Sequence, residues 1–170
     1  LVDAKGRLPE GVDPQKVFAV IWTTTPWTMP ANVAIALNPE LKYVWAQFGD
    51  EVYLLAADLV AKVAEDNHLG DYQIVGSAMG SELEGLIFQH PFLDRQSPIV
   101  LGGHVTLEQG TGCVHTAPGH GQEDFEVGEK YGLPVICPVD QSGRFTEEGG
   151  KFAGQFVFEA NVPVIKELAA

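Results

Sequence analysis

Residues 110–125, GTGCVHTAPGHGQEDF, contain the clearest change in the chain from an extended to a helical pattern. Residues 113–116, CVHT, are rich in side chains that favour a pleated sheet and predict a short strand. The Pro-Gly pair that follows ends this strand, because proline cannot donate to a sheet ladder. A helix is expected over residues 122–131, with Gly132 placed to end it. The stretch therefore predicts a strand, a tight turn and a helix in succession.

Outward from this stretch, most of the chain consists of short extended runs separated by turn signals. Further strands are predicted over residues 18–22, 33–37, 43–48, 52–56, 72–75, 86–89 and 99–101. Helices are also predicted over residues 58–68 and in the C-terminal tail, FEANVPVIKELAA. Short strands at this spacing, with few helices, indicate a mainly β fold with α insertions and a barrel-like form. We expect residues 1–170 to form a single domain.

The composition argues against several classes of protein. The 170 residues carry 10 basic and 23 acidic side chains, a formal net charge of −13. A free-standing nucleic-acid binder is normally basic, so the chain alone is not expected to attract a polyanion. There is no apolar run long enough for a membrane span, and the first residues do not resemble a signal peptide. Cys113 and Cys137 fit neither a disulfide framework nor a zinc quartet, so we expect a soluble protein of the reducing cytosol.

The histidines and acids of residues 110–125 support three interpretations. His115 can be a hydrogen-bonded structural residue, and Glu123 and Asp124 can simply stabilise the first turn of a helix through its dipole. Alternatively, His115, His120 and Asp124 are plausible metal ligands. However, zinc hydrolases place two histidines four residues apart on one helix, whereas these are five apart across a Pro-Gly pair. In the third interpretation, a metal-free pocket uses one acid to hold a substrate cation.

A second polar group, the threonine triplet at residues 23–25, follows the apolar run of residues 17–22. Threonine favours strands, so propensity alone can explain the triplet. Pro26 ends the strand, however, and places hydroxyls at a strand end, where they can hold a water molecule. Trp27 is either a core residue or a flat surface on which a nucleic-acid base can stack.

Together, two long motifs resemble a known family. WTTTPWTMPANVAIALNPE (residues 22–40) and GTGCVHTAPGHGQEDFEVGEKYGLPV (residues 110–135) are similar to the editing domain of isoleucyl-tRNA synthetase, a connective-peptide insertion in a class I aminoacyl-tRNA synthetase. The valyl and leucyl relatives resemble the first motif with TTRPET and TTRPDT, and they have Lys and Met at the position of His115. The tail EANVPVIKEL also resembles the end of the insertion, so the isoleucyl branch fits best.

This resemblance implies a barrel-like editing domain excised from a larger synthetase, without the catalytic core that aminoacylates tRNA. The implied activity is post-transfer editing, in which the ester of mischarged valyl-tRNA(Ile) is hydrolysed, with valyl-adenylate as a possible second substrate. The implied partners are the 3′ end of tRNA(Ile) carrying valine and the rest of the synthetase chain, with no membrane, no cofactor and no metal. We expect a monomeric, cytoplasmic protein. The alternatives are a metal-dependent hydrolase and a non-catalytic aminoacyl-tRNA binding module.

Site roles also follow from the resemblance. Asp124 is expected to bind the α-ammonium group of the amino acid, and His115 to line the side-chain pocket and exclude isoleucine. The substrate and the attacking water are expected to be held by Thr23, Thr24 and Thr25. Trp27 is assigned to the terminal adenosine and Asn32 to the ester end, while His120 and Glu123 are spare candidates for the chemistry. No strong general base is evident, so positioning of water is expected to carry much of the catalysis.

Overall fold

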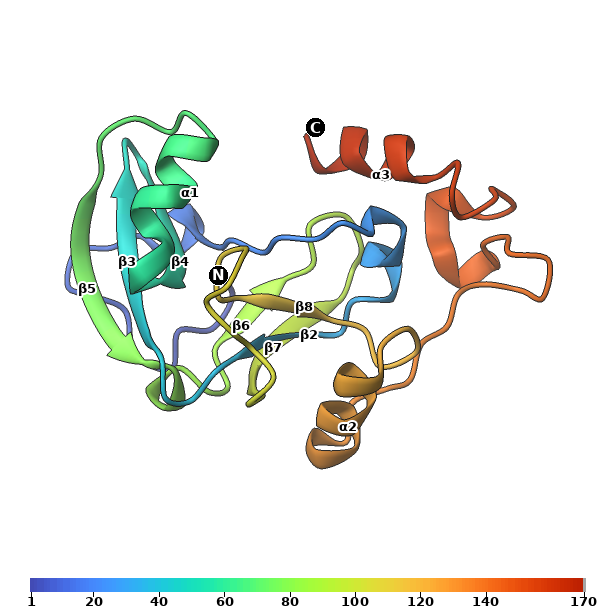
Figure 1. Cartoon of the computed structure of the whole chain (residues 1–170), viewed down its shortest axis with the longest axis horizontal. Helices are drawn as coiled ribbons and strands as arrows, with labels where there is room; N and C mark the ends of the chain where they lie inside the picture. Colours follow the sequence, from blue (N-terminus) through green and yellow to red (C-terminus); the bar gives the residue numbers. More distant parts are fainter. Residues whose placement is uncertain (170) are drawn as a thin grey trace.

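The computed structural model describes residues 1–169, which form two four-stranded sheets with helices around them (Figure 1). In spatial order, the first sheet contains β1 (Val17–Ala19), β4 (Glu51–Ala56), β3 (Lys42–Phe48) and β5 (Gln73–Met79). The second contains β6 (Ile87–Gln89), β7 (Gln96–Leu101), β2 (Ala34–Leu37) and β8 (Val114–Thr116). Both sheets are mixed, because β1 pairs with β4 and β2 with β7 in parallel.

The helices are short and connect or flank the sheets. The α-helices are α1 (Val60–Asp66), α2 (Gln122–Tyr131) and α3 (Asn161–Leu168). The 3-10 helices are η1 (Pro14–Lys16), η2 (Pro26–Ala31), η3 (Ala57–Leu59), η4 (Gly80–Glu82) and η5 (Glu147–Phe152). Figure 1 shows α1 against the first sheet, and α2 and α3 on either side of the second sheet. Among residues 1–169, none of the helices has the length and apolar character needed to cross a bilayer.

The predicted fold class is confirmed, with one qualification on its form. Each predicted strand overlaps an observed one, and α2 has the predicted bounds, with Gly132 at φ 63° in the left-handed region. The strands of residues 1–169 nevertheless form two separate sheets rather than one closed barrel. The first strand is also shorter than predicted: β1 ends at Ala19, and Val20–Trp22 leave the sheet to line a cavity.

Three apolar clusters hold these elements together. The largest packs α1 and both sheets around fully buried side chains that include Tyr43, Trp45 and Leu54. A second cluster lies under α2 and contains Val100, Val105 and Val127. The third joins η2 to the C-terminal region through Met29 of η2, Phe145, Phe152, Val157, Ala160 and Val164. Burial of these clusters therefore stabilises α1 and α2 on the sheets and η2 on the C-terminal region.

Candidate functional site

A cavity of about 240 Å³ lies where η2, β8 and the start of α2 meet. It is lined by Thr23, Thr25, Trp27, Thr28, His115, Ala117, His120 and Asp124. The two resembling motifs, which are far apart in the sequence, thus supply all of its walls. Five residues assigned from the resemblance share this cavity: Thr23, Thr25, Trp27, His115 and Asp124.

The threonine triplet forms the entrance to η2. The Thr25 backbone N–H donates to Thr23 Oγ1 at 2.9 Å, which folds the triplet into a tight turn. Thr25 then takes the N-cap position of η2. Pro26 suits the first position of the helix, because the backbone N–H that proline lacks would have no partner within the helix there. Thr24 is exposed, and its Oγ1 lies 3.5 Å from Thr25 Oγ1. The triplet therefore presents Thr23 and Thr25 to the cavity, while Thr24 is not among the lining residues.

Thr28 is a lining residue that the sequence interpretation missed. It is buried in η2, three residues after Thr25, and its Oγ1 donates to the Thr25 carbonyl at 2.9 Å. Its Oγ1 also lies 2.9 Å from His115 Nε2. The spacing of three residues after a proline start could have placed Thr28 on the same side of a helical turn as Thr25. It was overlooked because residues 26–31 were not predicted to be helical.

His115 forms a buried, neutral wall of the cavity. Its side chain comes from β8, where it pairs opposite Ile35, and it is only 9% exposed. Burial, helped by the charges of His90 and His120, lowers the pKa of His115 to about 4. The ring is therefore uncharged at neutral pH. Both of its nitrogens are already engaged, one by Thr28 and the other by Asn32.

Asp124 connects the fold to the cavity. It lies in the first turn of α2, where a carboxylate is favoured by the helix dipole. Its Oδ2 accepts a hydrogen bond from the Ala117 backbone N–H at 2.9 Å, which fixes the turn between β8 and α2. Within residues 1–169, its Oδ1 accepts no hydrogen bond. One oxygen thus supports the structure, and the other can receive a cation in the cavity.

Two aromatic rings close another side of the cavity. The Trp27 ring meets His120 edge to face, with ring centroids 5.1 Å apart. The Trp27 backbone N–H donates to Asn161 Oδ1, which ties this wall to α3. Burial lowers the pKa of His120, while the nearby Asp124 charge opposes that shift. His120 is therefore part of the wall, as one of the two spare candidates for the chemistry.

Asn32 and Glu123 occupy other positions. Asn32 is 4% exposed and lies behind His115, outside the lining of the cavity. Its Nδ2 donates to His115 Nδ1 at 2.8 Å, so it contacts the histidine where the resemblance implied the ester end of the substrate. Glu123 is exposed and lines a different depression, beside His104 and Lys130.

The geometry of a metal site is not seen around these residues. Within the described part of the chain, no three His, Cys, Asp or Glu side chains come together as a set of ligands. In particular, both ring nitrogens of His115 form hydrogen bonds to other side chains. The ligand set considered from the sequence, His115, His120 and Asp124, thus lacks a free nitrogen on its first member.

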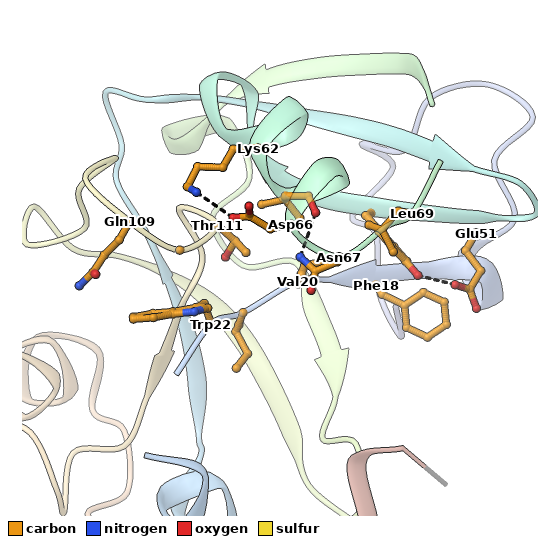
Figure 2. Close-up of a pocket in the computed structure, with 15 residues that line it drawn as sticks. Phe18, Val20, Trp22, Glu51, Lys62, Asp66, Asn67, Leu69, Gln109 and Thr111 are labelled. Atoms are coloured by element: carbon orange, nitrogen blue, oxygen red, sulfur yellow. Dashed lines mark hydrogen bonds and ion pairs between the residues drawn. The ribbon is translucent and has the colours of Figure 1, made fainter. Parts of the chain in front are cut away.

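A larger cavity, of about 890 Å³, is lined by residues 18–22, which lead into the triplet, and by residues of α1 (Figure 2). Trp22, 48% exposed, stands on one wall, and Lys62 and Asp66 of α1 form an ion pair on another. Gln109 and Thr111, just before β8, lie nearby. Trp22, which lines this cavity, directly precedes Thr23, which lines the smaller one.

Comparison with known families and sequences shows which proteins this chain is related to. Residues 14–156 match the family model described as "Leucyl-tRNA synthetase, editing domain". An isoleucine–tRNA ligase of Moorella thermoacetica is 59% identical over 170 residues, which is 100% of this chain and 18% of that protein. An isoleucine–tRNA ligase of Natranaerobius thermophilus is 53% identical over 167 residues, 98% of this chain and 18% of that protein. The chain thus spans about a fifth of the length of these relatives.

Solved structures support the same fold. The crystal structure of GlLeuRS-CP1 superposes with a TM-score of 0.69 at 18% identity and covers 90% of this chain and 80% of that one. The editing domain of P. falciparum cytosolic leucyl-tRNA synthetase, in a form with two insertions deleted, gives a TM-score of 0.65 at 12% identity and covers 89% and 75%. With the family model matching most of its residues, the chain belongs to the family of leucyl-tRNA synthetase editing domains.

Proposed function

We propose that this chain is the editing domain of an isoleucyl-tRNA synthetase and hydrolyses the aminoacyl ester of valyl-tRNA(Ile) in the cytoplasm. Water adds to the ester carbonyl, the bond from that carbon to the ribose oxygen breaks, and valine and tRNA(Ile) are released. Valyl-adenylate is a second substrate of the same site. The observation that carries the proposal is the small cavity shared by Thr25, His115 and Asp124. The high identity to isoleucine–tRNA ligases supports the choice of amino acid.

Recognition of the amino acid rests on one charge. An aminoacyl ester carries a free α-ammonium group, and Asp124 offers it Oδ1 while Oδ2 stays bonded to Ala117. A charge-assisted hydrogen bond of this kind is about twice as strong as a neutral one. It also orients the substrate, because the ammonium and the side chain leave the same carbon atom. The valine side chain then faces His115 and Thr28.

Selection against isoleucine rests on the rigidity of that wall. Valine and isoleucine differ by one methylene, worth only about 0.8 kcal/mol of burial energy, so a pocket that accepts isoleucine cannot strongly reject valine. Two-step sorting by synthetases is an established example of how this limit is overcome. A pocket that fits valine rejects isoleucine by overpacking, which costs about 1–3 kcal/mol where the wall cannot move. His115 is held on both nitrogens and is suited to be such a wall.

The chemical step is assigned to a positioned water molecule. Thr23 and Thr25 supply hydroxyl groups that can donate and accept at the cavity mouth. His115 is unsuited to act as a base, because its Nδ1 already accepts from Asn32 and burial lowers its pKa. The site therefore accelerates hydrolysis mainly by holding water and ester together.

The cavity of about 240 Å³ is small for an amino acid and a nucleoside together, so we place the terminal nucleoside of the tRNA in a second space. The cavity of about 890 Å³ is lined by Trp22, the residue directly before Thr23 of the small cavity. Trp22 is a half-exposed aromatic ring on which a base can stack, a contact worth about 1–3 kcal/mol. We assign the amino acid to the small cavity and the nucleoside to the large one. Trp27 lies beside His120 in the wall of the amino-acid cavity, and its assignment to the adenosine stays a prediction.

The test is deacylation of valyl-tRNA(Ile) by the purified chain, followed as release of labelled valine. We expect hydrolysis of valyl-tRNA(Ile) and little hydrolysis of isoleucyl-tRNA(Ile), with rates unaffected by a metal chelator. Binding of valyl-tRNA(Ile) without turnover would contradict the proposal in favour of a binding module. Loss of activity with chelator, restored by metal, would contradict it in favour of a metal-dependent hydrolase.

A further inference from the structure

The hydrogen bonds of Asn32, the side chain behind His115, allow only one orientation of its amide group. Asn32 Nδ2 lies 2.9 Å from the Ala34 carbonyl oxygen, which can only accept. This atom must therefore be the amide nitrogen, and its second hydrogen points to His115 Nδ1 at 2.8 Å. The remaining atom, Asn32 Oδ1, accepts from the Ser97 hydroxyl at 2.5 Å. Both hydrogens of the Asn32 amide are thus donated, and its oxygen accepts from Ser97.

This orientation determines where the proton of His115 lies. Because Asn32 donates to Nδ1, that nitrogen carries no hydrogen, and the proton of the neutral ring is on Nε2. Nε2 then donates to Thr28 Oγ1 at 2.9 Å, and the Thr28 hydroxyl in turn donates a hydrogen bond to the Thr25 carbonyl at 2.9 Å. A continuous chain of donors therefore runs from Ser97 to Thr25. We call it the Ser97–Thr25 relay, with Asn32, His115 and Thr28 as its middle members.

Ser97 lies outside the cavity that the relay serves. It is 3% exposed on β7, and neither Ser97 nor Asn32 lines the cavity of about 240 Å³. Two residues before Ser97, Arg95 donates from Nη1 to the carbonyls of Pro30 and Asn32, at 2.9 Å each. This segment of the chain therefore secures both the backbone at the end of η2 and the side chain behind His115.

We propose that Ser97 and Asn32 are positioning residues that hold His115 as its Nε2–H tautomer in one orientation and thereby set the discrimination between valine and isoleucine. The inference rests on the proposed function for its substrate. Excluding a side chain that is larger by one methylene requires a rigid cavity wall. Overpacking costs free energy only where the surrounding side chains cannot shift. Rotation of the His115 ring breaks bonds at both nitrogens, and those bonds depend in turn on Asn32 and Ser97.

The principal test is Ser97→Ala, which leaves Asn32 Oδ1 without its donor. We expect the ratio of isoleucyl- to valyl-tRNA(Ile) deacylation rates to rise about 3- to 10-fold, the effect of one lost buried hydrogen bond, with valyl hydrolysis largely kept. Thr116→Val is the matched control. It also removes a buried hydroxyl, on β8 beside His115, but that hydroxyl bonds only the Val114 carbonyl, at 3.2 Å. We expect the ratio to stay unchanged in the control.

A second variant tests the direction of the protons without relying on activity. Asn32→Asp keeps the shape of the side chain but cannot donate to His115 Nδ1. Long-range proton–nitrogen NMR of the ring should show Nε2–H alone in the parent, a mixture of tautomers in Ser97→Ala, and a proton on Nδ1 in Asn32→Asp. A parent ring protonated on Nδ1 would overturn the relay.

The outcomes separate this inference from the proposed function. If Ser97→Ala and Thr116→Val give the same ratio and the same ring spectrum as the parent, Ser97 has no positioning role. If Ser97→Ala lowers both rates equally and leaves the tautomer unchanged, its role is structural only, and the inference is wrong. If the parent protein hydrolyses neither ester, the proposed function is contradicted. The NMR spectra of the His115 ring still test the Ser97–Thr25 relay in that case.

Discussion

Asp124 divides its two carboxylate oxygens between the fold and the cavity, and this division makes its role testable. Oδ2 holds the turn through Ala117, a bond that an asparagine oxygen can also accept. Asp124→Asn therefore removes the charge while keeping most of the structural contact. The same division explains why the acid at residue 124 differs from its neighbour. Glu123 lies in the same first turn but is exposed and outside the cavity.

For Asp124→Asn, we expect affinity for a non-hydrolysable valyl-adenosine analogue to fall about 10- to 100-fold, as loss of a charge-assisted bond implies. Thermal stability should change little. The measurements are titration calorimetry and a melting curve, with Glu123→Gln as the matched control that keeps full affinity. Unchanged affinity with a lower melting temperature would assign Asp124 to the helix dipole alone.

At His115, the expected effect of truncation is on size selection. His115→Ala opens space for the extra methylene of isoleucine, so the ratio of isoleucyl- to valyl-tRNA(Ile) deacylation rates should rise. The measurement is single-turnover deacylation of both esters, with His104→Ala as a control outside the cavity. A role as general base predicts instead a fall of about 10²–10⁴-fold on valyl ester and no gain on isoleucyl ester. That outcome would remove His115 from the size filter.

His115 should also make stability depend on pH. The pKa of His115 is about 4 in the fold, below the ordinary value of about 6.5 for a histidine, so the unfolded chain binds a proton first as the pH falls. Its contribution is complete above about pH 6.5 and is lost as the pH falls towards 4. Between about pH 7.5 and pH 5 the loss is roughly 2 kcal/mol, to which the lowered pKa values of His90 and His120 add in the same direction.

The measurement is urea unfolding of the parent and His115→Gln at both pH values. The variant keeps a polar side chain but cannot take up the proton, so it should lose clearly less stability at about pH 5. An equal loss in the two proteins would show that burial of His115 does not govern the acid response.

Among the elements, those with strong local signals were predictable and those set by distant contacts were not. α2 was predicted with its observed bounds, because an acidic first turn and a terminal glycine are local signals. η2 was missed, because a short 3-10 helix containing Pro30 leaves no periodic pattern to detect. The early end of β1 was missed too, since apolar residues 20–22 suit a cavity wall as well as a strand.

The candidate site was predictable to a similar extent. The motif resemblance suggested Thr25, His115 and Asp124, and the structure brings them into one cavity. Their chemical roles remain predictions. Ser97 could not be found, because its contact with Asn32 joins residues 65 positions apart and no local pattern marks it. The resemblance pointed to Asn32, but its hydrogen bond to His115 is known only from the structure.

The turn between β8 and α2 is an element with little tolerance for added bulk. A Cβ on Gly119 would lie 2.2 Å from the Ile136 carbonyl oxygen, so that backbone must move. We expect Gly119→Ala to cost about 1–3 kcal/mol of unfolding free energy and to weaken binding of the valyl-adenosine analogue, because His120 and Asp124 follow directly. Gly103→Ala is the control, since a Cβ there meets nothing within 4 Å. Equal stability of the two variants in urea would contradict this account.

For the whole molecule, the net charge of −13 sets how it can meet a nucleic acid. A tRNA is a polyanion, so the acidic chain and its proposed substrate repel each other at long range. Among the lining residues of the large cavity, the proposed nucleoside site, the one cation is Lys62, and it is already paired with Asp66. In our proposal, the remainder of the synthetase therefore supplies most of the affinity for tRNA. The chain itself contributes selection and hydrolysis.

This division predicts an unusual response to salt. Valyl-tRNA(Ile) hydrolysis by the 170-residue chain, at substrate concentrations well below saturation, should rise as salt increases from about 0.02 to 0.2 M, because added ions screen the repulsion. A basic tRNA-binding protein shows the opposite trend, since salt competes with its phosphate contacts. The control is the valyl ester of adenosine, which carries no phosphate and should be hydrolysed at a rate nearly independent of salt. If valyl-tRNA hydrolysis falls steeply with salt while the adenosine ester is unaffected, the chain makes several phosphate contacts of its own. Delivery by the rest of the synthetase would then be unnecessary to explain how an acidic domain reaches its substrate.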